Sequence, residues 1–229
     1  MSIKKAAIVL ARMNSKRFPG KALHNIEGRC LLEWCVFNLK KQSNYDIVLA
    51  TSSESSDEPL SKLAEELQIN CFRGHLHDVY LRVIECIDYF QIKSFARING
   101  DSPFPSSELI NQAFDLLESE NLDFVTNLAP RSFPYGVAVE VFDAQMFKVN
   151  YQNLSSDAHH EHITSYFYEN LNSFKYKNIS SGIENLEDIR LVVDEVSDIN
   201  SIQKVIKSID ANKPISYEEI TKILKEDND

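Results

Sequence analysis

The stretch Ala6-Ala-Ile-Val-Leu-Ala11 contains no polar side chain, and the loop Arg12-Met-Asn-Ser-Lys-Arg-Phe-Pro-Gly-Lys21 follows it directly. A short run that is apolar throughout is typical of a strand buried on both faces of a sheet. Pro19 and Gly20 are turn-forming residues that interrupt extended structure. The sequence therefore predicts a central strand whose C-terminal end opens into a basic loop.

Strand and helix patterns alternate along the chain after this stretch. Strands are expected at 46–51, 70–73, 94–98 and 123–127, and helices at 31–39, 58–67, 77–90 and 106–118. Such alternation is typical of parallel strands joined by crossover helices. We therefore predict one α/β domain over residues 1–229, with a Rossmann-like, open, mostly parallel twisted sheet and helices on both of its faces.

The alternation changes between about residues 129 and 165. This segment contains the turn-forming residues Pro130, Pro134 and Gly136. In 136–142 apolar and other side chains alternate, as in a strand of a partly exposed sheet. We therefore expect a small β excursion from the main sheet. A helix at 158–170, strands at 173–179 and 189–194, and helices after Ser197 and Ser216 complete the expected fold.

The composition excludes several classes of protein. With 24 Lys and Arg against 34 Asp and Glu, the formal net charge is -10, which argues against a general nucleic-acid binder because backbone phosphates require surplus positive charge. The four cysteines lack zinc-ligand spacing and resemble small buried residues in a reducing compartment. No run approaches the ~20 apolar residues of a membrane span, and the first residues do not resemble a signal peptide. We expect a cytoplasmic protein without membrane contact.

The candidate site residues directly follow the predicted strands, because ligands of open α/β sheets bind beyond the carboxyl ends of the strands. Arg12, Lys16, Arg17 and Lys21 place four cations within ten residues of an acidic protein, which favours binding of an anion such as a phosphate. The loop matches neither the Walker A motif nor the dinucleotide glycine fingerprint. A solvated basic loop would explain the cluster equally well.

Two acidic residues follow later predicted strands. Asp101 comes after Arg97-Ile-Asn-Gly100, and Asp194 ends the apolar run 191–193. Carboxylates beside a bound phosphate are typical ligands of Mg²⁺. Each aspartate could instead form a turn or begin a helix. If the two aspartates and the basic loop serve one purpose, they converge on a single nucleoside triphosphate and its magnesium ion.

Taken together, these segments resemble the cytidylyltransferase family that includes the CMP-sialic acid and CMP-Kdo synthetases, and most closely its spore-coat-polysaccharide type. The resemblance runs nearly from end to end, over residues 11–21, 72–74, 78–79, 97–103, 136–140, 161–164 and 190–194. It implies a nucleotide-diphospho-sugar transferase fold. It also implies transfer of CMP from CTP to an acidic sugar, such as a nonulosonic acid, for surface polysaccharide or glycoconjugate synthesis.

The resemblance further implies roles for individual residues. Arg12, Lys21 and Asp101 would carry catalysis, and Asp101 and Asp194 would hold Mg²⁺. The nucleotide site would comprise Ala11, Arg12, Asn14, Ser15, Arg17, Lys21, Arg73, Arg97, Asn99 and Gly100. The acceptor would contact Tyr135, Glu140, Glu161 and His162. The excursion at 129–165 would serve acceptor binding or a homodimer contact supplied by Val137, Val139 and Val141.

Two residues depart from the family pattern. Asn14 stands where glycine is usual, although Asn tolerates a positive φ better than most residues, and Ala138 stands where an acid is common. The identity of the sugar therefore stays open. The chain could use another nucleotide or a sugar 1-phosphate, or it could be a non-catalytic nucleotide-binding or scaffold protein of the same fold. A nicotinamide-dependent dehydrogenase is disfavoured because the glycine fingerprint is missing.

Overall fold

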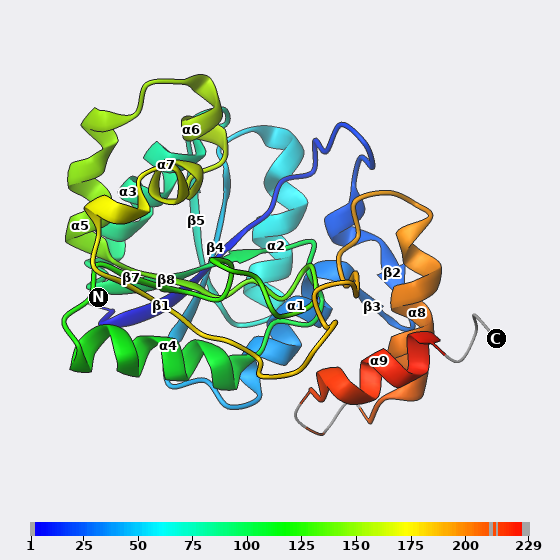
Figure 1. The fold of residues 1–229 in the computed structure, drawn as a ribbon. Coiled ribbons are helices and arrows are strands. Elements are labelled where there is room, and N and C mark those ends of the chain that lie inside the picture. Colours follow the sequence, from blue (N-terminus) through cyan, green and yellow to red (C-terminus); the bar gives the residue numbers. More distant parts are fainter. Residues whose placement is uncertain (1–2, 211–212, 214, 226–229) are drawn as a thin grey trace.

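A seven-stranded sheet forms the centre of the protein in a computed structural model that describes residues 3–210, 213 and 215–225 (Figure 1). Its strand order is β5 (Asn70–Gly74), β4 (Asp46–Ser52), β1 (Lys5–Leu10), β6 (Ser94–Asn99), β8 (Glu140–Asp143), β7 (Phe124–Thr126) and β9 (Tyr176–Asn178). All neighbouring strands are parallel except β8, which runs antiparallel to both β6 and β7. The predicted open, mostly parallel α/β sheet is therefore confirmed.

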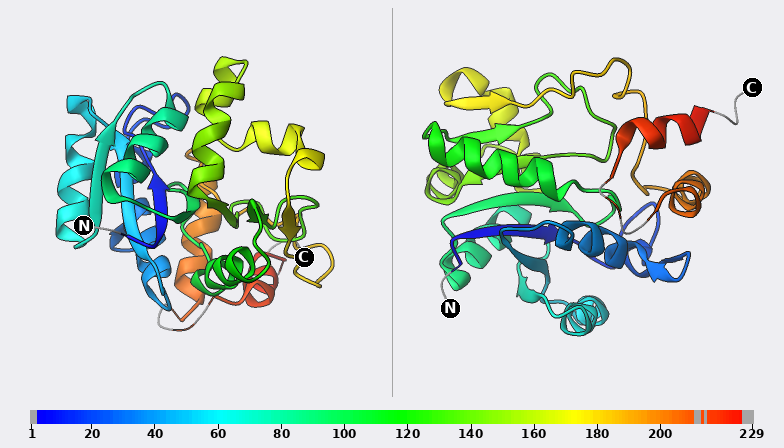
Figure 2. Two further views of the ribbon diagram at one scale, coloured as in Figure 1. Left: turned by 90° about the vertical axis from the view of Figure 1, so that its left-hand side faces the viewer. Right: turned by 90° about the horizontal axis from the view of Figure 1, so that it is seen from below.

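Helices cover both faces of this sheet (Figures 1 and 2). One core contains side chains of α1 (Leu31–Lys40), α2 (Glu58–Glu66), α4 (Ser107–Ser119), α8 (Asp198–Ser208) and α9 (Tyr217–Lys225). The other contains side chains of α3 (Val79–Phe90), α5 (Ala144–Val149) and α7 (Ser165–Glu169). Strand β1 contributes Ala7 and Val9 to the first core and Ala6 and Ile8 to the second, because successive side chains of a strand point to opposite faces. Its fully apolar sequence follows from this double burial.

The C-terminal ends of β1 and β6 lie side by side. Leu10 pairs with Asn99 in the sheet, and the Gly100 N–H donates a hydrogen bond to the Leu10 carbonyl at 3.0 Å. A Cβ atom added to Gly100 would lie 2.9 Å from the Cβ atom of Ala11. The loops that follow the two strands therefore begin in direct contact, which requires glycine at position 100.

The predicted excursion is not separate from the sheet. Its strand is shorter than expected, and as β8 it lies between β6 and β7. Val137, Val139 and Val141 are at most 1% exposed and belong to the protein's own core, so they are not available for the homodimer contact proposed for them. The polar residue Glu140 made this alternating segment resemble a half-exposed strand. In the structure Glu140 is 1% exposed, because its polar partners Arg97 and Tyr168 lie inside the protein.

Other expected elements are interrupted. The expected helix at 158–170 is divided into α6 (Asp157–Glu161) and α7, because the chain leaves the helical conformation at His162 (φ −101°, ψ 75°). Residues 189–194 form only a single β-bridge, between Tyr135 and Arg190. Helix α5 and the short hairpin of β2 (Asn25–Ile26) and β3 (Arg29–Cys30) were not predicted.

Within the part of the chain that the structure describes, no helix has the length and apolar character to cross a bilayer.

The segment 189–194 is nevertheless closely fitted to its neighbours. The Tyr135 N–H donates to the Ile189 carbonyl and the Leu191 N–H to the Tyr135 carbonyl, both at 2.7 Å, and the Val193 N–H donates to the Asp101 carbonyl at 3.0 Å. Gly136 has a φ of 102°, and a Cβ atom there would lie 2.4 Å from the Leu191 carbonyl oxygen. Glycine at position 136 therefore allows this segment to approach the end of the sheet.

Replacing Gly136 with alanine should destabilise the protein by about 3 kcal/mol or more, because the new methyl group adds a backbone clash to an unfavourable φ. Gly182→Ala is the matched control: its φ is 69°, but a Cβ atom there meets nothing within 4 Å, so a loss of only about 1 kcal/mol is expected. Urea unfolding of both variants gives the comparison. Equal losses would contradict the close approach of Gly136 to Leu191.

Candidate active site

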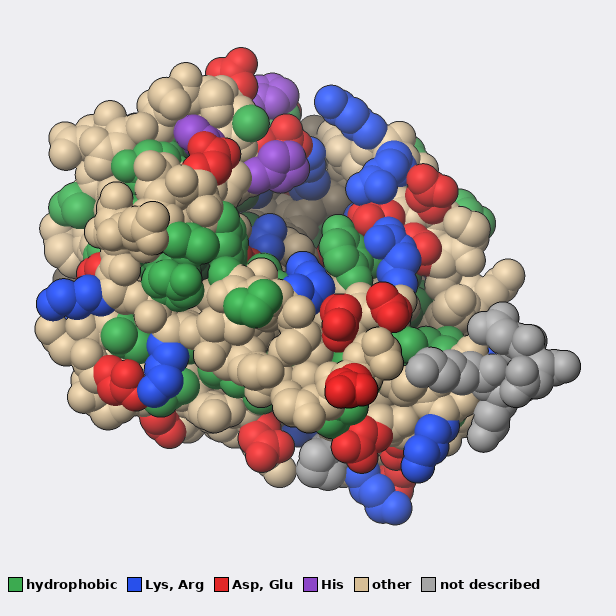
Figure 3. Space-filling model, viewed as in Figure 1, with side chains coloured by type: hydrophobic (Ala, Val, Ile, Leu, Met, Phe, Trp, Pro, Cys, Tyr) green, Lys and Arg blue, Asp and Glu red, His purple; other side chains and the backbone are tan. Residues whose placement is uncertain are grey.

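A pocket of about 620 Å³ lies at the C-terminal ends of β1 and β6. It is visible as a hollow whose walls and rim carry Lys, Arg and His side chains (Figure 3). The walls come from the basic loop after β1, the residues after β6, the segment 128–138, the α6–α7 junction and Asp194. This is the position at which open α/β sheets bind their ligands.

Most of the residues predicted for the site line this one pocket. They are Ala11, Arg12, Ser15, Arg17, Lys21, Arg97, Asn99, Gly100, Asp101, Tyr135, Glu161, His162 and Asp194. The basic loop and the two aspartates therefore share a single cavity, although they are far apart in the sequence.

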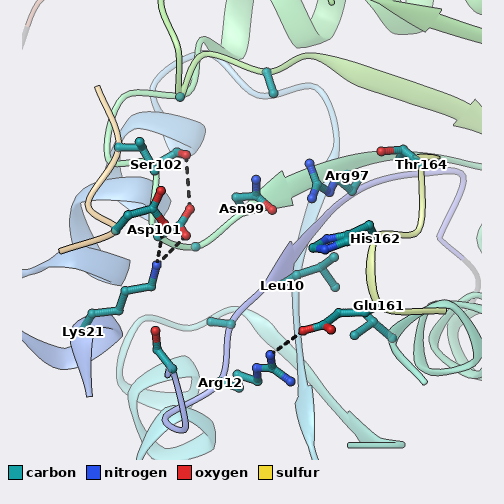
Figure 4. Close-up of a pocket in the computed structure, with 18 of the residues that line it drawn as sticks. Leu10, Arg12, Lys21, Arg97, Asn99, Asp101, Ser102, Glu161, His162 and Thr164 are labelled. Atoms are coloured by element: carbon teal, nitrogen blue, oxygen red, sulfur yellow. Dashed lines mark hydrogen bonds and ion pairs between the residues drawn. The ribbon is translucent and has the colours of Figure 1, made fainter. Parts of the chain in front are cut away.

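Lys21 joins these segments. Its ammonium group donates to Asp101 Oδ2 at 2.7 Å (Figure 4). It also donates to the Val193 carbonyl at 3.0 Å and to Asp194 Oδ1 at 3.4 Å. The side chains of Lys21 and Asp194 are only 14% and 12% exposed, so water screens these charges weakly. One partly buried cation thus holds two carboxylates close to each other.

Asp57 holds the start of the basic loop. It is 1% exposed, and it accepts hydrogen bonds from the Met13 N–H at 2.7 Å, from the Thr51 hydroxyl at 3.0 Å and from both the N–H and the hydroxyl of Ser52. Burial by itself raises the pKa of Asp57, but these hydrogen bonds outweigh it, so the pKa lies below its ordinary value. The charged carboxylate therefore anchors the loop directly after Arg12.

Asp194 lies among three cations. Besides Lys21, Arg17 Nη2 lies 3.0 Å from Asp194 Oδ1 and Arg190 Nη2 lies 2.8 Å from Asp194 Oδ2. Asp198 accepts from the Asp194 N–H at 2.7 Å and the Glu195 N–H at 2.9 Å. Burial opposes the charged form of Asp198, but these hydrogen bonds and Arg190 keep its pKa below the ordinary value. The turn that carries Asp194 is thereby fixed at the start of α8.

A second set of charges lies on the opposite side of the pocket from Lys21 and Asp101 (Figure 4). Arg97 Nη1 donates to Glu140 Oε2 at 2.9 Å, and the Tyr168 hydroxyl donates to Glu140 Oε1 at 2.9 Å. Burial raises the pKa of Tyr168, and the neighbouring Glu140 carboxylate raises it further. Glu140 itself does not line the pocket, so it is not placed to contact an acceptor as expected. Instead it holds the side chain of Arg97.

The α6–α7 junction carries Glu161 and His162 into the pocket. Arg12 Nη2 donates to Glu161 Oε1 at 2.8 Å (Figure 4). Helix α6 is held against the start of α3 by Asp78, whose Oδ2 atom lies 2.8 Å from both His160 Nδ1 and the Tyr151 hydroxyl. The break at His162, which the helical pattern did not indicate, is what lets both side chains reach the cavity.

Two residues predicted for the nucleotide site do not line the pocket. Asn14 donates to the Ser56 hydroxyl at 3.2 Å, and its φ is not positive, so the replacement of the usual glycine causes no backbone strain. Arg73 donates to the Ser52 carbonyl at 3.1 Å and to the Glu54 carbonyl at 2.8 Å, and it pairs with Glu58. Both side chains therefore brace the loop after β4 rather than face the cavity.

Several pocket residues were not predicted, among them Arg82, Ser102, Arg131 and Thr164. Arg82 lies within a helix, where a charged residue ordinarily indicates the solvent face. Arg131 lies in the segment with Pro130, Pro134 and Gly136, which has no helical or strand periodicity. The sequence contains no local signal that distinguishes these side chains from surface residues, because only the packing of α3 and of the loop turns them inward.

A family model described as cytidylyltransferase matches residues 6–228, almost the whole chain. The chain belongs to the cytidylyltransferase family. The resemblance stated from the sequence is thereby confirmed, and the protein is a nucleotidyltransferase rather than a non-catalytic scaffold.

This cytidylyltransferase is 24% identical to the spore coat polysaccharide biosynthesis protein SpsF of Bacillus subtilis, over 97% of the chain and 94% of that protein. It shares its fold with a cytidylyltransferase from Leptospira borgpetersenii, with a TM-score of 0.92 and 24% identity over 99% of the chain and 95% of that structure. It also shares the fold of a CMP:2-keto-3-deoxy-manno-octonic acid synthetase complexed with CTP. The TM-score is 0.66 and the identity 13%, over 89% of the chain and 98% of that structure.

Asp57→Asn should destabilise this cytidylyltransferase by about 2 kcal/mol at pH 7, because a buried amide cannot accept all the hydrogen bonds that the carboxylate accepts. The folded-state pKa of Asp57 is below its ordinary value of 3.8. Its charge therefore contributes stability above that value, and this contribution is lost as the pH falls through the folded-state pKa.

Urea unfolding from pH 7 to pH 3 should show the two proteins becoming more similar in stability under acidic conditions. Asp46→Asn, at an exposed position that begins β4, is the control and should change little at any pH. A difference between wild type and Asp57→Asn that stays constant over this pH range would show that the carboxylate charge is not what holds the loop.

Proposed function

We propose that this pocket binds CTP with Mg²⁺ and transfers CMP to a hydroxyl group of an acidic sugar, with release of pyrophosphate. The observation that carries the proposal is the shared position of Lys21, Asp101 and Asp194 in a cavity that also receives Arg12 and Arg17. A triphosphate and a divalent cation need this combination of fixed positive charge and nearby carboxylates.

The basic loop supplies the charge for the triphosphate. Arg12, Arg17 and Lys21 all line the cavity, and Asp57 fixes the backbone from which Arg12 projects. Cations held in place before the reaction stabilise the negative charge that grows on the phosphate in the transition state without having to reorganise. Lys21 and Arg12 are therefore proposed to act on the reacting phosphates.

Asp101 and Asp194 fit a magnesium ion by the chemistry of their donors. Each presents a carboxylate oxygen within 3.4 Å of the same Lys21 nitrogen, so both can face one small cation. Mg²⁺ prefers one or two carboxylates together with phosphate oxygens and water. The ion, when bound, would neutralise charge on the phosphate oxygens. Lys21 contacts both carboxylates and Arg17 contacts Asp194, which fixes the positions of the two side chains.

The proposed reaction is an in-line displacement. The acceptor hydroxyl forms a new oxygen–phosphorus bond at the α-phosphate, the bond between that phosphorus and the oxygen bridging to the β-phosphate breaks, and pyrophosphate leaves with the bonding electrons. The hydroxyl proton passes to solvent. Positioning of the two substrates and neutralisation of charge supply most of the catalysis in such a reaction.

An acidic acceptor is favoured by the excess of cations in the pocket. Arg82, Arg97 and Arg131 line it in addition to the basic loop. One protein of the same fold is named for synthesis of the CMP derivative of 2-keto-3-deoxy-manno-octonic acid, and its structure contains CTP. A sugar 1-phosphate would satisfy the same cations, so it remains the second candidate acceptor. The homodimer and the cytoplasmic location stay predictions.

A pyrophosphate-release screen tests the function. CTP, ATP, GTP and UTP are each combined with Mg²⁺ and with a panel of keto-acid sugars and sugar 1-phosphates. We expect release with CTP and a keto-acid sugar only. Release with a sugar 1-phosphate but with no acid sugar, or with another nucleotide in preference to CTP, would contradict the proposed substrates.

Lys21→Met and Asp101→Asn should each lower kcat by about 100-fold or more, because each removes a group that acts on charge developing in the transition state. Lys5→Met is the control, since Lys5 pairs with Asp115 and Glu118 and does not line the pocket. Circular dichroism of each variant checks that the fold persists. Turnover equal to that of the wild type in folded Asp101→Asn would refute the magnesium assignment.

A further inference from the structure

Arg82 is a buried cation that faces the pocket from the first turn of α3. It is 2% exposed and lines the cavity. Its Nη1 atom donates to the His75 carbonyl at 3.0 Å, but its buried Nε atom has no hydrogen-bond partner among the described residues. No carboxylate among the described residues forms an ion pair with Arg82, so the buried Nε donor of its guanidinium group is unused.

Such a residue is costly for the folded protein. A buried charge without a paired carboxylate loses its hydration and recovers little in return. Burial and, to a lesser extent, repulsion by Arg12 lower the pKa of Arg82 to about 10, against a partial offset from Asp57 and Asp78. An anion placed near Arg82 and Arg12 would relieve both effects.

Arg73, on the neighbouring strand β5, shows how an arginine with a structural role looks in this protein. Its guanidinium group donates to the backbone carbonyls of Ser52, Ser53 and Glu54 and pairs with the Glu58 carboxylate. Arg82 has one such partner, although it is the more deeply buried of the two. The difference indicates that Arg82 is kept for a ligand rather than for the fold.

We propose that Arg82 binds the acidic group of the acceptor sugar. This inference rests on the proposed function and names the residue that would recognise the acid. A guanidinium group can form two parallel hydrogen bonds with a carboxylate or with a phosphate, so either kind of acidic acceptor satisfies it.

The position of Arg82 favours the acceptor over the triphosphate of CTP. Helix α3 is tied to α6 by the contact of Asp78 with His160, and α6 carries Glu161, which pairs with Arg12. Lys21, Asp101 and Ser102 lie on the other side of the cavity (Figure 4). The first turn of α3, which carries Arg82, therefore packs beside α6.

Kinetics of Arg82→Met, Arg82→Lys and Arg73→Met test the inference with CTP and the most active acceptor of the screen. We expect Arg82→Met to raise the KM for the acceptor by about tenfold or more and to leave the KM for CTP within about twofold. Arg82→Lys should lie between wild type and Arg82→Met, because it keeps the charge but not the paired donors. Arg73→Met should leave both KM values unchanged.

Two kinetic outcomes would overturn the inference without affecting the proposed function. A rise in the KM for CTP instead of that for the acceptor would assign Arg82 to the triphosphate. Unchanged values for both substrates would remove Arg82 from the binding site. If the active acceptor is a sugar phosphate rather than a keto acid, the same variants test the same contact with that substrate.

Thermal unfolding without ligand provides a second, independent readout. If Arg82 serves a ligand at the expense of the fold, the melting temperature of Arg82→Met should exceed that of wild type by on the order of 2–5 °C. The melting temperature of Arg73→Met should be lower than that of wild type. A lower melting temperature for Arg82→Met would show a structural role and overturn the inference. This comparison needs no substrate, so it decides about Arg82 even if the wild type transfers CMP to no acceptor and the proposed function fails.

Discussion

The contact of one ammonium group with two carboxylates determines how the site is assembled. Lys21 reaches Asp101, 80 residues later, and Asp194, 173 residues later, so three loops meet at one nitrogen atom. Their backbones must approach closely for this contact to form, and glycine permits it at the two crowded places, position 100 beside Ala11 and position 136 beside Leu191. The sheet beneath supplies the alignment, since β1 and β6 end next to each other.

The pocket is cationic in a protein whose net charge is -10, and most of its cations are already paired. Arg12 contacts Glu161, Arg97 contacts Glu140, and Arg17 contacts Asp194. Such pairs hold long side chains in defined positions and keep like charges from repelling each other before a substrate arrives. Arg82 differs from these three, because no described carboxylate pairs with it. A site that holds its charges in advance loses little energy to reorganisation when an anion binds.

Residues whose role depends on local pattern were predictable, and those whose role depends on a distant partner were not. The strand at 6–11 and its basic loop follow from apolar periodicity and charge, and they lie where expected. Glu140 was assigned to the acceptor by the family resemblance, whereas Arg97 and Tyr168 bind it inside the protein. Arg73 was placed in the nucleotide site by analogy, but the backbone carbonyls after β4 bind it instead.

By itself the sequence determined the α/β class, the central strand, the basic loop and the family, because hydrophobic period, glycine and proline positions and short motifs are read within a few residues. Only the tertiary structure decided that β8 enters the main sheet, that the helix after residue 157 breaks at His162, and that Arg82 turns toward the cavity. The physical reason is that burial and charge pairing are properties of contacts between segments tens to hundreds of residues apart, and no local pattern encodes the partner.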